Sequence, residues 1–100
     1  MDKIKIGPLE WNIVQVPLDG KELNHSEYLG SYTQAELTIR IASDMPDSVR
    51  EVTIWHEIIH ILANQRNITL EESQVDALAF GLIEFLIDNN LDTKILSPKP

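Results

Sequence analysis

The sequence predicts an α+β fold, in which a strand-rich first half is followed by two helices. Apolar and polar residues alternate over much of the first forty positions, whereas apolar residues recur every three or four positions over the second half. Because the strands come before the helices and do not alternate with them, the pattern favours α+β over α/β. A chain of 100 residues is the size of one small domain. We therefore expect residues 1–100 to form a single domain.

The strands are expected between about residues 3 and 41. Lysine and isoleucine alternate in KIKI, and the alternation resumes in EWNIVQV after a Gly-Pro break. In AELTIRIA, Leu37, Ile39 and Ile41 fall on one face and polar residues on the other. Strands with one apolar face predict a small antiparallel sheet that packs on a core through that face.

Two helices are expected after the strands, over about residues 47–65 and 70–89. Each start carries a capping-box pattern, Ser48 with Glu51 and Thr69 with Glu72. Apolar side chains recur at helical spacing in both segments: Val49, Val52, Trp55, Ile58, Ile59 and Leu62 in the first, and Val75, Leu78, Ala79, Leu82, Ile83, Phe85 and Leu86 in the second. Both helices are therefore expected to pack through an apolar stripe.

Composition narrows the classes of function. The absence of cysteine excludes disulfides and thiolate zinc sites. A net charge of −8 repels phosphate backbones, so we expect no nucleic-acid partner. The start, MDKIKIGPLEW, has no apolar segment typical of a signal peptide, and no apolar run approaches the roughly 20 residues of a membrane span. We therefore expect a cytoplasmic protein without a membrane partner.

The most informative segment is VTIWHEIIHIL, residues 52–62. His56 and His60 are four positions apart, so in a helix they lie on one face, one turn apart. Two imidazoles placed in this way can bind one Zn²⁺. Glu57 is rotated by about 100° from His56 and borders that face, where it can deprotonate the attacking water. The motif predicts a zinc site with His56 and His60 as ligands and Glu57 as catalytic base.

The alternative to a metal site is an amphipathic helix with structural histidines, in a metal-free interaction domain. A chance match to three fixed positions in so short a chain is expected in fewer than about one sequence in a hundred. The three side chains also lie in an apolar stretch, where polar groups are costly to bury unless they are paired or ligated. Both considerations favour the metal site.

A hydrolytic zinc site has three protein ligands and one open position. The metzincin pattern places a third histidine six positions after His60, but Arg66 stands there. The next helix offers Glu72, with Asp76 one turn later on the same face. We expect Glu72 to be the third ligand and Asp76 to accept a hydrogen bond from a histidine ring. Glu71 and Asp76 remain alternative ligands, and capping of the helix is a competing role for Glu72.

These two segments together resemble the ImmA/IrrE-type zinc metallopeptidases, especially the short members from phages and prophages. That family combines HExxH with a later helix of the form E-x-x-A-N-x-F-A. The corresponding positions here are Glu72, Val75, Asp76, Leu78 and Ala79. The resemblance implies a minimal zincin-like fold, with a small sheet packed on the HExxH helix, Zn²⁺ as cofactor, and a repressor-like regulator as substrate. The chain departs from the family at the end of the second helix, where LIEFLIDNN replaces an LLMP-like ending.

The expected function is therefore zinc-dependent hydrolysis of a peptide bond in a protein or peptide substrate. The alternative is a non-catalytic zincin-like domain that binds a protein partner and holds zinc structurally. His25, Tyr28 and Tyr32 are candidates for stabilising the oxyanion. The strand over residues 37–41, if it lies at the sheet edge, is expected to pair with an extended peptide.

Overall fold

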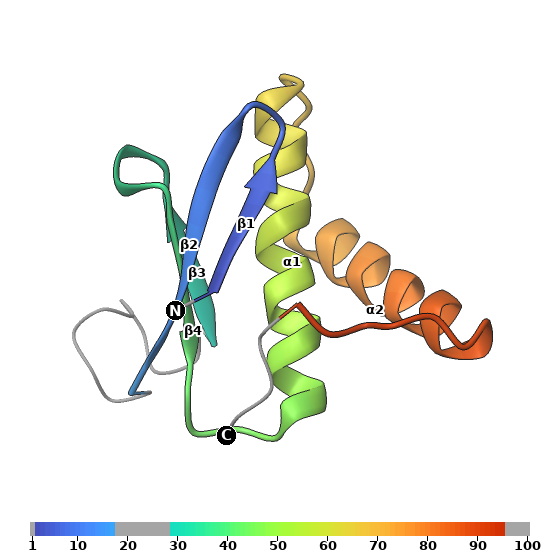
Figure 1. Cartoon of the computed structure of the whole chain (residues 1–100). Coiled ribbons are helices and arrows are strands. Elements are labelled where there is room, and N and C mark those ends of the chain that lie inside the picture. Colours follow the sequence, from blue (N-terminus) through green and yellow to red (C-terminus); the bar gives the residue numbers. More distant parts are fainter. Residues whose placement is uncertain (1, 18–28, 96–100) are drawn as a thin grey trace.

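Figure 1 shows the chain as a computed structural model, in which residues 2–17 and 29–95 are described. Within these residues a four-stranded sheet lies on one side of a long helix, and a second helix lies on the other side. The elements in chain order are β1 (Asp2–Ile6), β2 (Leu9–Val16), β3 (Gly30–Thr33), the short 3₁₀ helix η1 (Gln34–Glu36), β4 (Thr38–Ala42), α1 (Asp47–Gln65) and α2 (Glu72–Asp88). The α+β class predicted from the sequence is confirmed.

The sheet is mixed, with the strand order β1-β2-β4-β3. β1 and β2 form an antiparallel hairpin, and β3 pairs antiparallel with β4, but β2 and β4 run parallel. The prediction of an antiparallel sheet is therefore wrong for the central pair. Alternation along a strand shows which face is buried but contains no information on the direction of its neighbour.

The core lies between the sheet and α1. It contains Ile6, Trp11, Ile13, Ile39, Ile41, Ile54, Ile58 and Ile61. The expected buried face of β4 is confirmed for Ile39 and Ile41, both of which are fully buried. Leu37 precedes the strand and has a left-handed backbone, because η1 ends there and the chain must turn before β4 begins.

α1 has the bounds that the sequence predicts, but its start is different. The N-cap is Pro46, and Ser48 and Glu51 do not form the expected capping box. Instead the Glu51 carboxylate accepts a hydrogen bond from the Ile95 backbone N–H at 3.2 Å. The buried Arg50 guanidinium donates to Gln15 of β2 at 3.0 Å, and this bond fastens the start of α1 to the sheet.

The side of α1 that faces the sheet passes through Ile54, Ile58 and Ile61. The expected stripe contained Ile58 but neither Ile54 nor Ile61. The helix lies between the sheet and α2, so it is apolar on more than one side, and periodicity alone could not identify the core face (Figure 1).

α2 begins at Glu72, two residues later than expected. Its capping box is formed by Glu71 and Gln74, with the Glu71 N–H donating to Gln74 Oε1 at 2.8 Å. The expected box of Thr69 with Glu72 is therefore wrong. Because Glu71 caps the helix, the carboxylate of Glu72 is available for other contacts.

The line of buried apolar side chains on α2 is narrower than expected. Val75 and Ala79 are fully buried, whereas Leu78 and Phe85 are 51% and 57% exposed. Among the described elements α1 is the main packing partner of α2, so only a thin line of the α2 side chains is covered. Neither helix of the described part has both the length and the hydropathy needed to cross a membrane.

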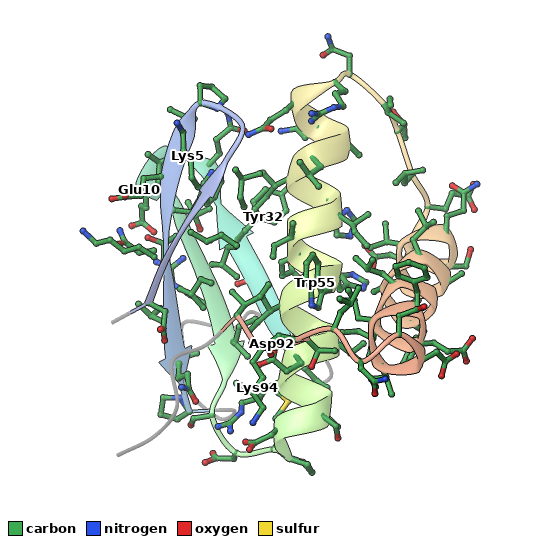
Figure 2. The ribbon with its side chains drawn as sticks, turned by 45° about the vertical axis from the view of Figure 1, so that its right-hand side comes forward. Lys5, Glu10, Tyr32, Trp55, Asp92 and Lys94 are labelled. Carbon is green, nitrogen blue, oxygen red and sulfur yellow. The ribbon has the colours of Figure 1, made fainter. Side chains whose placement is uncertain are left out.

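The segment after α2 returns to α1 (Figure 1). The Trp55 indole N–H donates to the Thr93 carbonyl at 3.3 Å, and Ile95 packs against the core. In Figure 2, Trp55 points out from α1 towards this segment, and Asp92 and Lys94 lie below it. The segment thereby covers the side of α1 that neither the sheet nor α2 reaches.

Candidate metal centre

The first turns of α2 meet the middle of α1 at three side chains. Glu72 Oε2 lies 3.0 Å from His56 Nε2, and Glu72 Oε1 lies 2.8 Å from His60 Nε2. One potential ligand atom from each residue lies within 4.8 Å of the others. The structure thus brings His56, His60 and Glu72 into a group that can hold a metal ion.

Local structure explains this convergence. The ring centroids of His56 and His60 are 4.9 Å apart, as expected for one turn of one helix face. α1 ends with Ile68 N–H bonded to the Ala63 carbonyl and Asn67 in a left-handed conformation, which reverses the chain. The fully buried Ala79 then lets α2 approach α1 closely.

The donor set fits zinc in type and spacing. Two neutral imidazoles and one carboxylate form a common hydrolytic zinc set, and tetrahedral ligands about 2.1 Å from a metal are separated by about 3.4 Å. The two nitrogen–oxygen distances here are 3.0 and 2.8 Å, so shifts of only a few tenths of an ångström would separate the donors enough. The Glu72 side chain is 69% exposed and is free to make that shift.

Asp76 lies behind the first histidine. Its Oδ1 is 2.8 Å from His56 Nδ1, the ring nitrogen opposite the one that faces Glu72. When Nδ1–H donates to this carboxylate, the tautomer is fixed and Nε2 is left with a free lone pair to bind a metal. Asp76 therefore occupies the orienting position predicted for it, while Glu71 is engaged in the helix cap.

We expect Asp76→Asn to weaken zinc binding by roughly 10- to 100-fold, because the neutral amide no longer favours the same imidazole tautomer. The affinity can be measured by competition with a chromophoric chelator. Asp88→Asn is the matched control, since Asp88 lies at the other end of α2 and is exposed. Equal affinities in the two variants would show that Asp76 does not orient His56.

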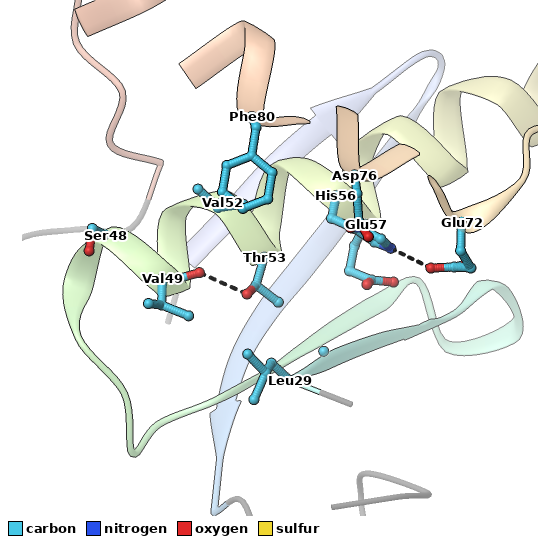
Figure 3. Close-up of a pocket in the computed structure, with 11 residues that line it drawn as sticks. Leu29, Ser48, Val49, Val52, Thr53, His56, Glu57, Glu72, Asp76 and Phe80 are labelled. Carbon is cyan, nitrogen blue, oxygen red and sulfur yellow. Dashed lines mark hydrogen bonds and ion pairs between the residues drawn. The ribbon is translucent and has the colours of Figure 1, made fainter. Parts of the chain in front are cut away.

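Glu57 is the buried acid of the site. It is 6% exposed, and burial raises its pKa to about 7, although His56 opposes the shift and the Glu72 carboxylate adds to it. In Figure 3 its carboxyl group lies beside the imidazole of His56 and faces Glu72. A carboxyl group with a pKa near neutrality can both accept and return a proton under ordinary conditions.

This burial predicts how the stability of the metal-free protein varies with pH. The pKa of Glu57 is about 7 in the fold and near 4.5 when unfolded, so unfolding releases a proton between these values. The contribution of protonated Glu57 to the free energy of unfolding is therefore fully present below about pH 4.5 and is lost as the pH rises to 7. The loss is expected to be on the order of 2–3 kcal/mol.

Glu57→Gln removes this titration. In urea unfolding with a chelator present, we expect the stability of the variant relative to the wild type to rise between about pH 4.5 and 7 and then to level off. A difference in free energy of unfolding that does not change with pH would contradict the assignment of a buried, protonated Glu57.

Tyr32 is the oxyanion candidate that the structure places near this site. Its ring centroid lies 6.3 Å from that of His60, and it packs edge-on against Trp11. Burial, and secondarily the charge of Glu57, raise the pKa of Tyr32, so its hydroxyl stays protonated and able to donate. His25 and Tyr28 lie outside the described residues.

The predicted peptide-binding strand is not at an edge. β4 lies between β2 and β3, so its hydrogen-bonding groups face both neighbours. The condition under which residues 37–41 were expected to pair with a peptide is therefore not met. The strand at this edge of the sheet is β3, which packs next to α1.

A cleft of about 470 Å³ opens from the metal group along both helices (Figure 3). His56, Glu57, Glu72 and Asp76 line one end of it. The remaining walls are formed by Leu29, Gly30, Ser48, Val49, Val52, Thr53 and Phe80. None of these seven residues was predicted to belong to a site. Val52 and Val49 could have been predicted, since they lie four and seven positions before His56 and share its face of the helix.

Gly30 allows the close approach that closes one wall. A Cβ atom at this position would lie 2.7 Å from Thr53 Cγ2 of α1, which is too close for any ordinary contact. The start of β3 can therefore lie against α1 because residue 30 has no side chain.

Comparisons with known proteins do not add to this geometry. No family model, no curated protein and no solved structure matches the chain.

Proposed function

We propose that the protein is a zinc-dependent peptidase of minimal zincin-like type, in which His56, His60 and Glu72 hold the metal and Glu57 is the general base. The observation that carries the proposal is the meeting of these three donors beside a buried acid at one end of an open cleft. Three protein ligands leave a coordination position for the reaction, as in hydrolytic zinc sites.

The chemistry is divided between the metal and the chain. When bound, zinc would lower the pKa of the attacking water and polarise the scissile carbonyl. The Glu57 carboxylate accepts a proton from the water as the water oxygen bonds to the carbonyl carbon. The same group, now a carboxylic acid, gives that proton to the amine nitrogen as the C–N bond breaks. Asp76 keeps His56 in one orientation throughout.

The substrate class that fits best is an extended segment of a protein. β3 lies at the sheet edge beside the site, where a peptide strand can be added through backbone hydrogen bonds. The likeness of the HExxH and E-x-x-A-N-x-F-A segments to ImmA/IrrE-type peptidases supports membership of that family and a repressor-like regulator as substrate. A structure of the Glu57→Gln variant with a peptide bound away from β3 would refute the strand-pairing part.

The exposed side chains of α2 favour the second candidate, a non-catalytic zinc-binding interaction domain. Leu78 and Phe85 are each more than half exposed and, being seven residues apart, lie on one face of α2. An apolar helix face of this kind is typical of protein-binding surfaces. Such a domain would bind its partner equally well with glutamine at position 57.

Incubation with a defined peptide mixture tests the proposal. We expect new peptide termini, detected by mass spectrometry, with zinc-loaded protein and none after the metal is removed with a chelator. Termini that persist at the same level with chelator would point to a contaminating hydrolase, and no termini at any zinc level would contradict peptidase activity towards this mixture.

A further inference from the structure

The cleft continues beyond the metal group, where its chemical character changes. Along α1, Val52 lies about 6 Å and Val49 about 10 Å before His56, at 1.5 Å per residue. On α2, Phe80 follows Asp76 by one turn on the same face. Figure 3 shows the Phe80 ring against Val52, with Leu29 on the opposite side of the opening. A large side chain that starts beside the metal group would reach the level of Val52 and Phe80, one helical turn away.

Among the described residues that line the cleft, the titratable groups are His56, Glu57, Glu72 and Asp76, all at the metal end, and none of the described lining residues is a lysine or an arginine. These carboxylates disfavour an anionic ligand. A cationic ligand would have Asp76 as its nearest acid, but this carboxylate already faces His56 Nδ1 at 2.8 Å.

The polar side chains among the described residues at the far end are those of Ser48 and Thr53. The Thr53 hydroxyl donates to the Val49 carbonyl at 2.7 Å, within its own helix, and so presents its methyl group to the cleft wall (Figure 3). Phe80 is 61% exposed although it is a large apolar side chain, and a ligand side chain packed against it would cover it.

We propose that this end of the cleft is a specificity pocket for a large, uncharged apolar side chain of the substrate next to the scissile bond. The pocket is formed by Val49, Val52 and Phe80. This inference rests on the proposed zinc peptidase, and it narrows the substrate class to segments that carry an aliphatic or aromatic residue at the cleavage site.

A series of hydroxamates tests the pocket without requiring hydrolysis. The probes are acetohydroxamate, 4-methylpentanohydroxamate, 5-aminopentanohydroxamate and 4-carboxybutanohydroxamate, titrated by calorimetry into the zinc-loaded protein. We expect the branched apolar tail to bind about tenfold or more tightly than the ammonium or carboxylate tail. Equal affinities, or tightest binding of the ammonium tail, would overturn the proposal.

The variant Phe80→Asp tests whether the preference for an apolar tail arises at this pocket, and Phe85→Asp is its matched control. Both residues are exposed on α2, but Phe80 lines the cleft and Phe85 does not. In Phe80→Asp we expect the preference for the apolar tail over the ammonium tail to fall at least tenfold. Phe85→Asp should behave as the wild type; the same loss in both variants would overturn the pocket.

The two proposals fail in different ways. If acetohydroxamate itself does not bind, the zinc site is wrong and the pocket assignment falls with it. If the apolar preference is present but no peptide is cleaved, hydrolysis is refuted and the pocket stands as a binding site.

Discussion

Replacing Glu57 with glutamine is expected to abolish peptide hydrolysis and to leave zinc binding intact. The two side chains have nearly the same shape, and Glu57 is buried on the turn of α1 that also presents His56. Glutamine cannot accept a proton from the attacking water, and loss of a positioned general base typically lowers the rate about 100- to 10,000-fold. The measurement is kcat/KM on a peptide that the wild type cleaves.

Two controls make this experiment decisive. The zinc content of Glu57→Gln should equal that of the wild type, because Glu57 is not among the three grouped donors. Asp88→Asn provides a matched loss of one acid far from the site. Full activity in Glu57→Gln would refute its role as base, and loss of zinc together with activity would show that it supports the metal instead.

The second large effect is expected at the third ligand. Glu72→Ala removes the carboxylate that approaches both imidazoles, so zinc affinity should fall by more than the roughly 10- to 100-fold typical of an outer-shell change. The free energy of unfolding of the metal-free variant should change little, since Glu72 is exposed and does not cap α2. Chelator competition and urea unfolding measure the two quantities separately.

Glu71→Ala is the matched control for this variant. Glu71 neighbours Glu72 in sequence, but its side chain belongs to the helix cap, so the expected loss is about 1 kcal/mol of stability with zinc affinity retained. The opposite pattern, with affinity lost in Glu71→Ala and kept in Glu72→Ala, would make Glu71 the ligand.

The residues that group at the site could be predicted from the sequence more fully than the strand pairing of the sheet. The spacing of His56 and His60 places both on one helix face whatever surrounds them, and α1 has the expected bounds because its polar flanks end a long periodic segment. Glu72 could be selected because a short connection brings the start of α2 near the end of α1.

The predictions that were wrong concern features that depend on long-range packing. The parallel pairing of β2 and β4 follows from β3 taking the outer position, which no local pattern specifies. Leu78 and Phe85 are exposed because α2 contacts one helix and not a sheet, so its apolar content exceeds the surface that covers it. The choice between Glu71 and Glu72 as the third ligand was undecided locally, since both are acids near a helix start.

His56, His60 and Glu72 are expected to bind one metal ion together. The zinc content per chain tests this, by elemental analysis of protein incubated with zinc and then dialysed. We predict about one zinc per chain in the wild type and far less in a His56→Ala, His60→Ala double variant that remains folded. A wild-type protein that retains no zinc, or a double variant that retains as much as the wild type, would show that these residues do not form a zinc site.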